Sequence, residues 1–210
     1  MLSNSNLPTI EKKRITHSAV IPLLFVGILW VIRLLQDGMS WDLSFFGIYP
    51  HKMTSLQGIV LHYLVHADIE HLWSNTLVVF ISGWFLFYFY STIVWRTLGC
   101  LWLLTGVFLW SIGRSGVHVG ASGLAYGIVF FLIFSGIIRQ HTPLIAVSLV
   151  VVFLYGSLTW GMFPFSELIK PDMSWEGHLS GGLAGLITAL MLQKQGPQKP
   201  QQLPEDEDSD

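Results

Sequence analysis

Charged residues are scarce in this sequence, in which Asp, Glu, Lys and Arg make up only 11% of the 210 residues. A soluble domain usually carries about 25% charged residues, so the composition excludes an ordinary water-soluble globular protein. The hydrophobic share is 52%, and the mean hydropathy is +0.57. We therefore expect an integral membrane protein that has the lipid bilayer as a partner.

Cysteine and net positive charge are lacking too. The single cysteine, Cys100, lies in an apolar run, and one cysteine cannot form an internal disulfide. The formal net charge of −2 indicates no nucleic-acid partner. Lys12, Lys13 and Arg14 precede the first apolar run, but no A-x-A cleavage site follows it. We interpret this run as a retained helix rather than a signal peptide.

Long apolar runs are what the sequence has in abundance. A membrane-spanning helix needs about 20 mostly apolar residues. Six segments meet or nearly meet this length, namely 17–35, 70–90, 92–112, 121–138, 143–162 and 176–193. The predicted fold class is therefore an all-α, polytopic membrane protein built as a bundle of six transmembrane helices.

The flanking segments differ in composition from the membrane region 15–193. Residues 1–14 form a polar N-terminal tail, and residues 194–210 are polar, rich in Pro and Gln, and acidic at the end. We expect this C-terminal tail to be disordered. The membrane region contains no internal repeat.

Lys and Arg predict the orientation, because cytoplasmic loops carry an excess of them. With six spans and a cytoplasmic N-terminus, seven of these residues face the cytoplasm and four face outside. The inner group is Lys12, Lys13, Arg14, Arg96, Arg139, Lys194 and Lys199, and the outer group is Arg33, Lys52, Arg114 and Lys170. We therefore expect both termini in the cytoplasm.

The first outer connection, 36–69, is too long for a plain turn and is rich in aromatic residues and leucine. Loops of more than about 12–15 residues are usually functional or disordered, and this one is too hydrophobic for disorder. We expect it to lie in the outer membrane interface with a short helix near 56–65. The alternative is a seventh, half-inserted helix.

Four polar residues on three predicted spans come to a similar depth near the outer surface. His71 and Asn75 are four residues apart and share one helix face. Ser122 begins the fourth span within "GASG", and His178 lies near the outer end of the sixth. Polar groups inside membrane spans are costly and usually functional, so this convergence predicts a site.

The residue types in this cluster are those of serine hydrolysis. Ser122 needs a base to accept its proton, and a neutral His178 imidazole can do this near pH 7. The His71 ring, the Asn75 amide and the Ser122 backbone N–H can stabilise an oxyanion. No buried Asp or Glu is apparent to orient the base, so we expect a dyad rather than a triad.

Small and aromatic residues around the cluster are expected to support it. Gly120 and Gly123 allow close backbone approach beside the serine. Tyr126 lies one helical turn after Ser122, where its ring could stack on the histidine. Gly181 and Gly185 follow His178 on one helix face, at a spacing that lets two membrane helices pack closely. Gly182 lies to one side of that row.

Three motifs together resemble the rhomboid intramembrane serine proteases over residues 15–193. They are "GASG" followed by Tyr126, "HADIEHLWSN", and His178 followed by Gly181 and Gly185. The family's spacing of His, His five residues later, and Asn four residues after that is met by His66, His71 and Asn75. The chain departs from the family in lacking the Trp-Arg pair of the first outer loop and the Glu that often ends the second span.

The resemblance implies a function and a place for it. Ser122 would be the nucleophile, His178 the general base and acid, His71 and Asn75 the oxyanion residues, and His66 a structural residue that ties down the first outer loop. It also implies a six-helix core, a mobile cap over residues 163–175, and substrates that are single-pass membrane proteins. No metal or other cofactor is implied, and family form and size suggest a bacterial inner membrane.

Alternative interpretations stay open for several residues and for the whole chain. Gly-x-Ser-Gly is a weak motif by itself, and His62, His66 and His71 could in principle hold zinc. His118 either holds the loop before the fourth span or is exposed. The chain could be a catalytically silent rhomboid-like protein that binds or chaperones membrane proteins. A small transporter or channel is a further alternative, although the polar residues do not line the full depth of the spans.

Overall fold

The computed structural model describes residues 7–164 and 173–200, and every regular element in these ranges is helical. Their one β pairing is an isolated bridge between Ile48 and His118. The α-helices are α1 (Leu7–Met39), α2 (Gly58–Leu61), α3 (Ile69–Phe89), α4 (Val94–Ile112), α5 (Ser122–Arg139), α6 (Thr142–Tyr155) and α7 (Trp175–Met191). The 3-10 helices are η2 (Ser44–Phe46), η3 (Met53–Ser55), η4 (His62–Leu64) and η5 (Gly156–Met162).

Five of the described helices are long and apolar enough to cross a membrane. They cover Thr9–Met39, Ile69–Phe89, Val94–Ile112, Ser122–Arg139 and Thr142–Met162, the last of which joins α6 and η5. The all-α, multi-pass prediction is thereby confirmed. α7 has 17 residues, which is about 25 Å of helix against a hydrocarbon core of about 30 Å. A sixth crossing therefore stays a prediction.

The first helix is longer than the apolar run that predicted it. The expected span covered 17–35, whereas α1 runs from Leu7 to Met39. Apolarity marks only the part of a helix that lies in hydrocarbon, while the backbone hydrogen bonds of a helix continue into polar flanks. The expected short helix near 56–65 is present as α2 followed directly by η4.

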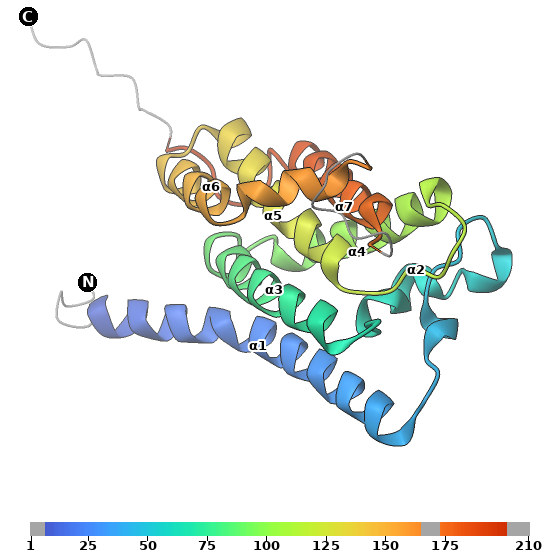
Figure 1. Cartoon of the computed structure of the whole chain (residues 1–210). Helices are drawn as coiled ribbons and strands as arrows, with labels where there is room; N and C mark the ends of the chain where they lie inside the picture. The colour runs from blue at the N-terminus through green and yellow to red at the C-terminus, as the bar shows by residue number, and fades with distance from the viewer. Residues whose placement is uncertain (1–6, 165–172, 201–210) are drawn as a thin grey trace, which may run out of the picture.

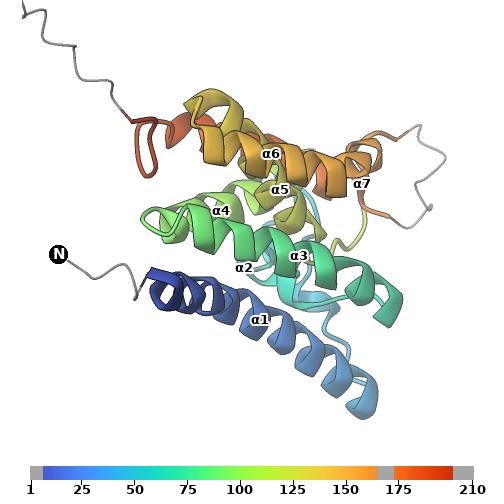
Figure 2. The ribbon, with the colours of Figure 1, turned by 90° about the vertical axis from the view of Figure 1, so that its left-hand side faces the viewer.

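α5 lies at the centre of the bundle. About two thirds (67%) of its apolar window is buried, against 22% for the windows of α1 and of α6 with η5. α5 packs against α7, α6 and α3, while α1 packs against α3 and α4 against α7. Figures 1 and 2 show α1 along one side of the bundle, with α6 and α7 on the opposite side.

Glycines bring the backbones of α5 and α7 into direct contact. A Cβ atom added at Gly181 would lie 2.0 Å from the carbonyl oxygen of Gly123, and one at Gly185 would lie 2.6 Å from that of Gly127. No residue with a side chain fits at such distances. Helix pairs in membranes rely on close packing of this kind, because lipid supplies no hydrophobic driving force between helices.

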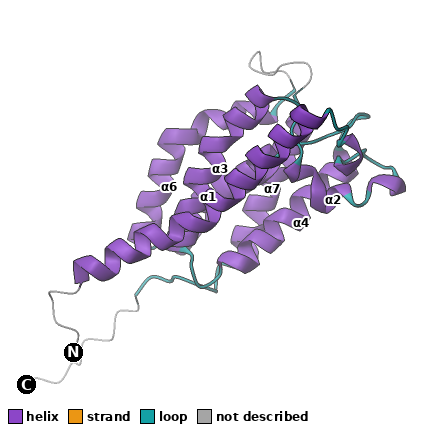
Figure 3. Cartoon of the chain, turned by 90° about the horizontal axis from the view of Figure 1, so that it is seen from below, coloured by secondary structure: helices purple, strands orange, loops and turns teal. Residues whose placement is uncertain are grey.

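The loop between α1 and α3, residues 40–68, covers one end of the bundle and is tied to the loop before α5. Ile48 and His118 exchange two backbone hydrogen bonds, of 2.9 and 2.8 Å, and the Gly120 N–H donates to the His62 carbonyl at 2.9 Å. The described ends of the chain lie at the opposite end of the bundle (Figure 3). The start of α5 is therefore held at the loop-covered end.

Candidate active site

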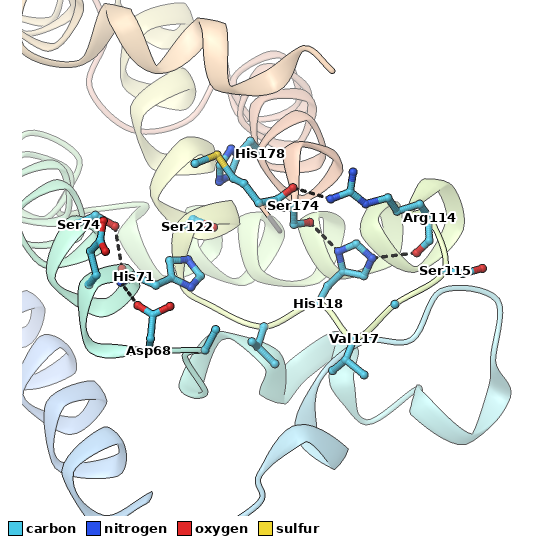
Figure 4. Close-up of a pocket in the computed structure, with 15 residues that line it drawn as sticks. Asp68, His71, Ser74, Arg114, Ser115, Val117, His118, Ser122, Ser174 and His178 are labelled. Carbon is cyan, nitrogen blue, oxygen red and sulfur yellow. Dashed lines mark hydrogen bonds between the residues drawn. The ribbon is translucent and has the colours of Figure 1, made fainter. Parts of the chain in front are cut away.

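A cavity of about 430 Å³ lies at the loop-covered end of the bundle. His71 on α3, Ser122 on α5 and His178 on α7 all line it, together with the segment Arg114–Val119. In the view of Figure 4, Ser122 lies between the two histidines. The structure therefore brings three of the four predicted polar residues to one polar cavity, from three different helices.

Ser122 is the first residue of α5, and the turn before it needs glycine. Gly120 has a φ of +119°, and a Cβ there would lie 2.5 Å from the His71 Cε1 atom. Backbone N–H groups in the first turn of a helix have no intrahelical partner, and the helix dipole favours negative charge there. The serine thus lies where a developing oxyanion can be bound.

The His178 ring is held in one orientation and one tautomer. Its Nδ1 lies 2.9 Å from the Gly161 carbonyl oxygen, which can only accept, so Nδ1 carries the proton. The Tyr126 ring stacks on it with centroids 4.2 Å apart and planes 5° from parallel. In the neutral ring this tautomer leaves Nε2 unprotonated, which is the form that a general base requires.

Gly161 contacts the candidate site, and the sequence analysis did not point to it. A Cβ at this position would lie 2.3 Å from the Tyr126 hydroxyl oxygen and 3.3 Å from the His178 Nδ1 atom. Glycine is therefore required for η5 to approach the stacked rings. Its position in η5 gives no local signal of this contact, because the contact depends on the packing of distant segments.

α3 presents its two predicted site residues, His71 and Asn75, one turn apart. Asp68 caps the helix by accepting from the His71 N–H at 2.7 Å, which fixes His71 in the first turn. Asn75 is 6% exposed, and its Nδ2 atom has no hydrogen-bond partner among the described residues. Asn75 does not line the cavity itself. It lies one turn deeper, with a buried donor available.

The start of α7 is fixed by a network that reaches the loop before α5. Ser174 caps α7 by accepting from the Gly177 N–H at 3.2 Å, and its Oγ lies 2.6 Å from His118 Nδ1. His118 Nε2 lies 2.9 Å from the carbonyl oxygen of Arg114. His118 is 5% exposed, so the first of its two interpretations is correct: it holds this loop.

An ion pair strengthens the same junction. Arg114 donates to the Met173 carbonyl at 2.7 Å, and its Nε lies 3.5 Å from an oxygen of Glu176, whose side chain is 1% exposed. The Ser174–Trp175–Glu176 sequence has a capping residue and an acidic residue in the first turn, so the helix start was detectable. The pairing of Glu176 with Arg114 was not detectable from the sequence.

His62 and His66 support the serine turn through the backbone. His62 Nδ1 donates to the Gly58 carbonyl at 2.7 Å, and His66 Nε2 accepts from the Ala121 N–H at 3.2 Å. Burial lowers the pKa of His62 to about 4, and that of His66 to about 3 with a smaller contribution from nearby His71. Both rings are therefore neutral at pH 7. Across the described residues, no group of three or more His, Cys, Asp or Glu could hold a metal ion.

The remaining predicted site residues lie around this centre. Gly123 contacts α7, where a Cβ would lie 3.1 Å from the Gly177 carbonyl oxygen. Gly181 and Gly185 form the contact with α5 that is described above, and Gly182 faces Met162, whose sulfur would lie 2.8 Å from an added Cβ. Most of the expected cap, 163–175, lies outside the described residues, which end at 164 and resume at 173.

These features define a class of protein: a multi-pass, all-helical membrane protein with serine and histidine side chains around a polar cavity at one end of the bundle. The rhomboid domain model matches residues 53–195. This chain belongs to the rhomboid family, as its motifs predicted.

Several relatives come from mycobacteria. Uncharacterized proteins of Mycobacterium tuberculosis and Mycobacterium bovis are 34% identical over 177 residues, which cover 81% of this chain and 73% of each relative. An uncharacterized protein of Mycobacterium leprae is 30% identical over 178 residues, 81% of this chain and 69% of its own length. The names of these relatives assign no activity.

Proposed function

We propose that this protein is an intramembrane serine endopeptidase that cleaves peptide bonds in or near the transmembrane segments of other membrane proteins. One observation carries the proposal. The Gly161 carbonyl and the Tyr126 ring hold the His178 ring in the tautomer whose Nε2 can act as the base, and Ser122 lines the same cavity. Membership of the rhomboid family supports this assignment.

The reaction begins with attack of Ser122 Oγ on the carbonyl carbon of the scissile bond. His178 Nε2 accepts the serine proton, and the carbonyl oxygen becomes an oxyanion. The His71 ring, the Asn75 Nδ2 group and the Ser122 backbone N–H donate to that oxygen. The C–N bond then breaks, and His178 returns its proton to the leaving amine.

Water completes the cycle. It enters the polar cavity, loses a proton to His178 Nε2 and attacks the acyl carbon on Ser122. The second tetrahedral intermediate collapses, the proton returns to Ser122 Oγ, and the new carboxyl end leaves. Stacking on Tyr126 and the hydrogen bond to the Gly161 carbonyl keep the imidazole in place during both proton transfers.

The placement in the membrane is part of the proposal. α7 forms the sixth crossing, the cavity faces the outer side, and both termini face the cytoplasm, as the distribution of Lys and Arg predicts. The membrane is the inner membrane of a bacterium. A substrate helix reaches the site from the bilayer, and helix-destabilising residues near its cleavage site let the backbone extend into the cavity.

The test is cleavage of a single-pass substrate by purified protein in lipid vesicles. Ser122→Ala and His178→Ala should each abolish cleavage while leaving the thermal unfolding midpoint close to that of the parent. Matched controls are Ser111→Ala and His17→Ala, which remove exposed side chains away from the cavity. Cleavage by Ser122→Ala at the rate of the parent would contradict the proposal.

A further inference from the structure

A second cavity, of about 350 Å³, lies between α1 and α4. Its floor is formed by Leu124 and Ile128, which are buried on α5. Residues of α1, α3 and α4 form its walls, and every lining residue is apolar. The Trp102 indole N–H, a polar group near it, already donates to the Val60 carbonyl at 2.9 Å. A polar ligand therefore finds no partner here.

The groove opens toward lipid rather than toward water. Its lining includes Ile21 and Trp95, which are 39% and 65% exposed on membrane-spanning helices. Trp95 packs edge-on against Phe87 of α3, and Phe25 of α1 packs edge-on against Trp102 of α4. Aromatic rings thus flank a groove whose open side faces the bilayer.

The dimensions of the groove favour a single hydrocarbon chain. Its α4 wall runs from Trp95 to Trp102, which is about 10 Å of helix axis. This length is fewer than two turns of a helix. It is too short a contact for a partner helix that crosses the membrane, but long enough for part of an acyl chain.

Positive charge lies at the end of the groove nearer the chain ends. Arg14 is seven residues before Ile21, two turns along the same face of α1. Arg96 is three residues before Gly99 on α4, and its Nη1 donates to the Gln195 Oε1 atom at 2.8 Å. The Arg14 guanidinium lies over the Tyr88 ring, 4.6 Å from its centroid. Lys12 and Lys13 add two further cations, against one carboxylate, Glu11, which accepts a hydrogen bond from Tyr88.

We propose that the groove binds one acyl chain of an anionic phospholipid, with the phosphate held between Arg14 and Arg96. The distance along α1 from Arg14 to Phe25 is about 16 Å, close to the thickness of one hydrocarbon leaflet, about 15 Å. The phosphate therefore comes to the level of the two arginines when the chain occupies the groove. This lipid site is independent of the proteolytic function.

Gly99 offers a way to close the groove without disturbing the fold. It lines the groove, and a Cβ added there would meet no atom within 4 Å. The first side-chain atom at position 99 therefore meets open space, and Gly99→Leu places an apolar side chain at the wall of the groove. Gly27 on α1 is the matched control, because a Cβ there also meets nothing within 4 Å and the residue does not line the groove.

The experiment is native mass spectrometry of the full chain, purified from vesicles of phosphatidylcholine and phosphatidylglycerol in equal amounts. The parent and Gly27→Leu should each retain one phosphatidylglycerol. Gly99→Leu should lower this retention about tenfold or more, and Arg14→Gln with Arg96→Gln should remove the preference for phosphatidylglycerol over phosphatidylcholine. Equal retention by Gly99→Leu and Gly27→Leu would overturn the proposal, as would phosphatidylcholine retained as well as phosphatidylglycerol or a second copy of the chain in place of lipid.

Discussion

α5 and α6 follow each other in the chain and are both strongly apolar, yet α5 is surrounded by protein and α6 faces lipid. About two thirds of the α5 window is buried, whereas Phe153 on α6 is 88% exposed. α5 differs in having glycines at positions 123, 127 and 136, where neighbouring segments come within contact distance. In a bilayer, apolarity tells which segments enter the membrane, and small residues tell which of them lie inside the bundle.

The same comparison separates the two helices that hold Ser122 and His178 from the helices that face lipid. Ser122 and His178 lie on the two helices whose backbones touch, so their relative position depends on a short, stiff contact. The lipid-facing helices α1 and α6 supply neither residue of the proposed dyad. The predictions below test this division in order of decreasing effect.

The largest effect is expected where α5 and α7 touch. Gly181→Leu places side-chain atoms where even a Cβ would lie 2.0 Å from the Gly123 carbonyl oxygen, so the helices must separate. Overpacking usually costs about 1–3 kcal/mol, and more in severe cases, and we expect a loss at the upper end of that range or beyond together with loss of cleavage. The readout is the thermal unfolding midpoint.

Gly27→Leu is the control for this substitution, because its site on α1 is open and glycine lowers helix stability. We expect an unchanged or slightly higher midpoint. If Gly181→Leu unfolds at the temperature of the parent, the contact between α5 and α7 is not what holds the dyad together.

A smaller effect is expected from the two residues on α3 that we propose as oxyanion donors. Asn75→Ala removes a buried donor that has no described partner in the resting protein, so its hydrogen bond forms only during the reaction. We expect kcat to fall by about 10²–10³ with KM nearly unchanged. His71→Ala should also lower kcat.

The control on the same helix is Ser82→Ala, because Ser82 donates only to the Val78 carbonyl within its own helix, at 2.6 Å. It should cleave nearly as fast as the parent. A kcat for Asn75→Ala within twofold of the parent would remove Asn75 from the mechanism.

Near neutral pH, the smallest effect is expected from the pH dependence of stability. Burial lowers the pKa of His62 to about 4 and of His66 to about 3, while an unfolded histidine titrates near pH 6.5. The unfolded state therefore binds protons first as pH falls. Stability from these residues is complete above about pH 6.5 and is lost toward the folded pKa values, by at most about 1.4 kcal/mol per pH unit for each histidine.

The measurement is the thermal unfolding midpoint between pH 8 and pH 4.5. His66→Gln should flatten the decline below pH 6.5, and the exposed His17→Gln serves as the control. A midpoint for the parent that does not change between pH 7 and pH 4.5 would show that the loop of residues 40–68 does not keep the His62 and His66 rings neutral.

The sequence predicted the parts of this molecule that depend on local pattern. Apolar runs located the membrane-crossing helices, and the spacing of His71 and Asn75 placed both on one face of α3. Gly-x-Ser-Gly placed Ser122 at a helix start, where the structure has it. These features follow from helix periodicity and membrane thickness, which the sequence displays directly.

Features that depend on the packing of distant segments could not be predicted. Gly161 touches His178 only because η5 folds back over α7. Arg139 appeared as one more cytoplasmic cation, but it is 6% exposed and donates to the carbonyl oxygens of Leu192, Gln193, Gln195 and Pro197. A basic residue at the end of a helix reveals nothing by itself about which distant carbonyl groups it will meet.

The most direct test of the central claim is the reaction of the folded protein with a fluorophosphonate, followed by mass spectrometry of the labelled peptide. An activated serine attacks this phosphorus centre, whereas an ordinary hydroxyl does not. We predict one adduct, on Ser122, in the parent, and none in His178→Ala. A parent protein that stays unlabelled, or a His178→Ala variant that labels as fast as the parent, would contradict the assignment of Ser122 and His178 as a catalytic pair.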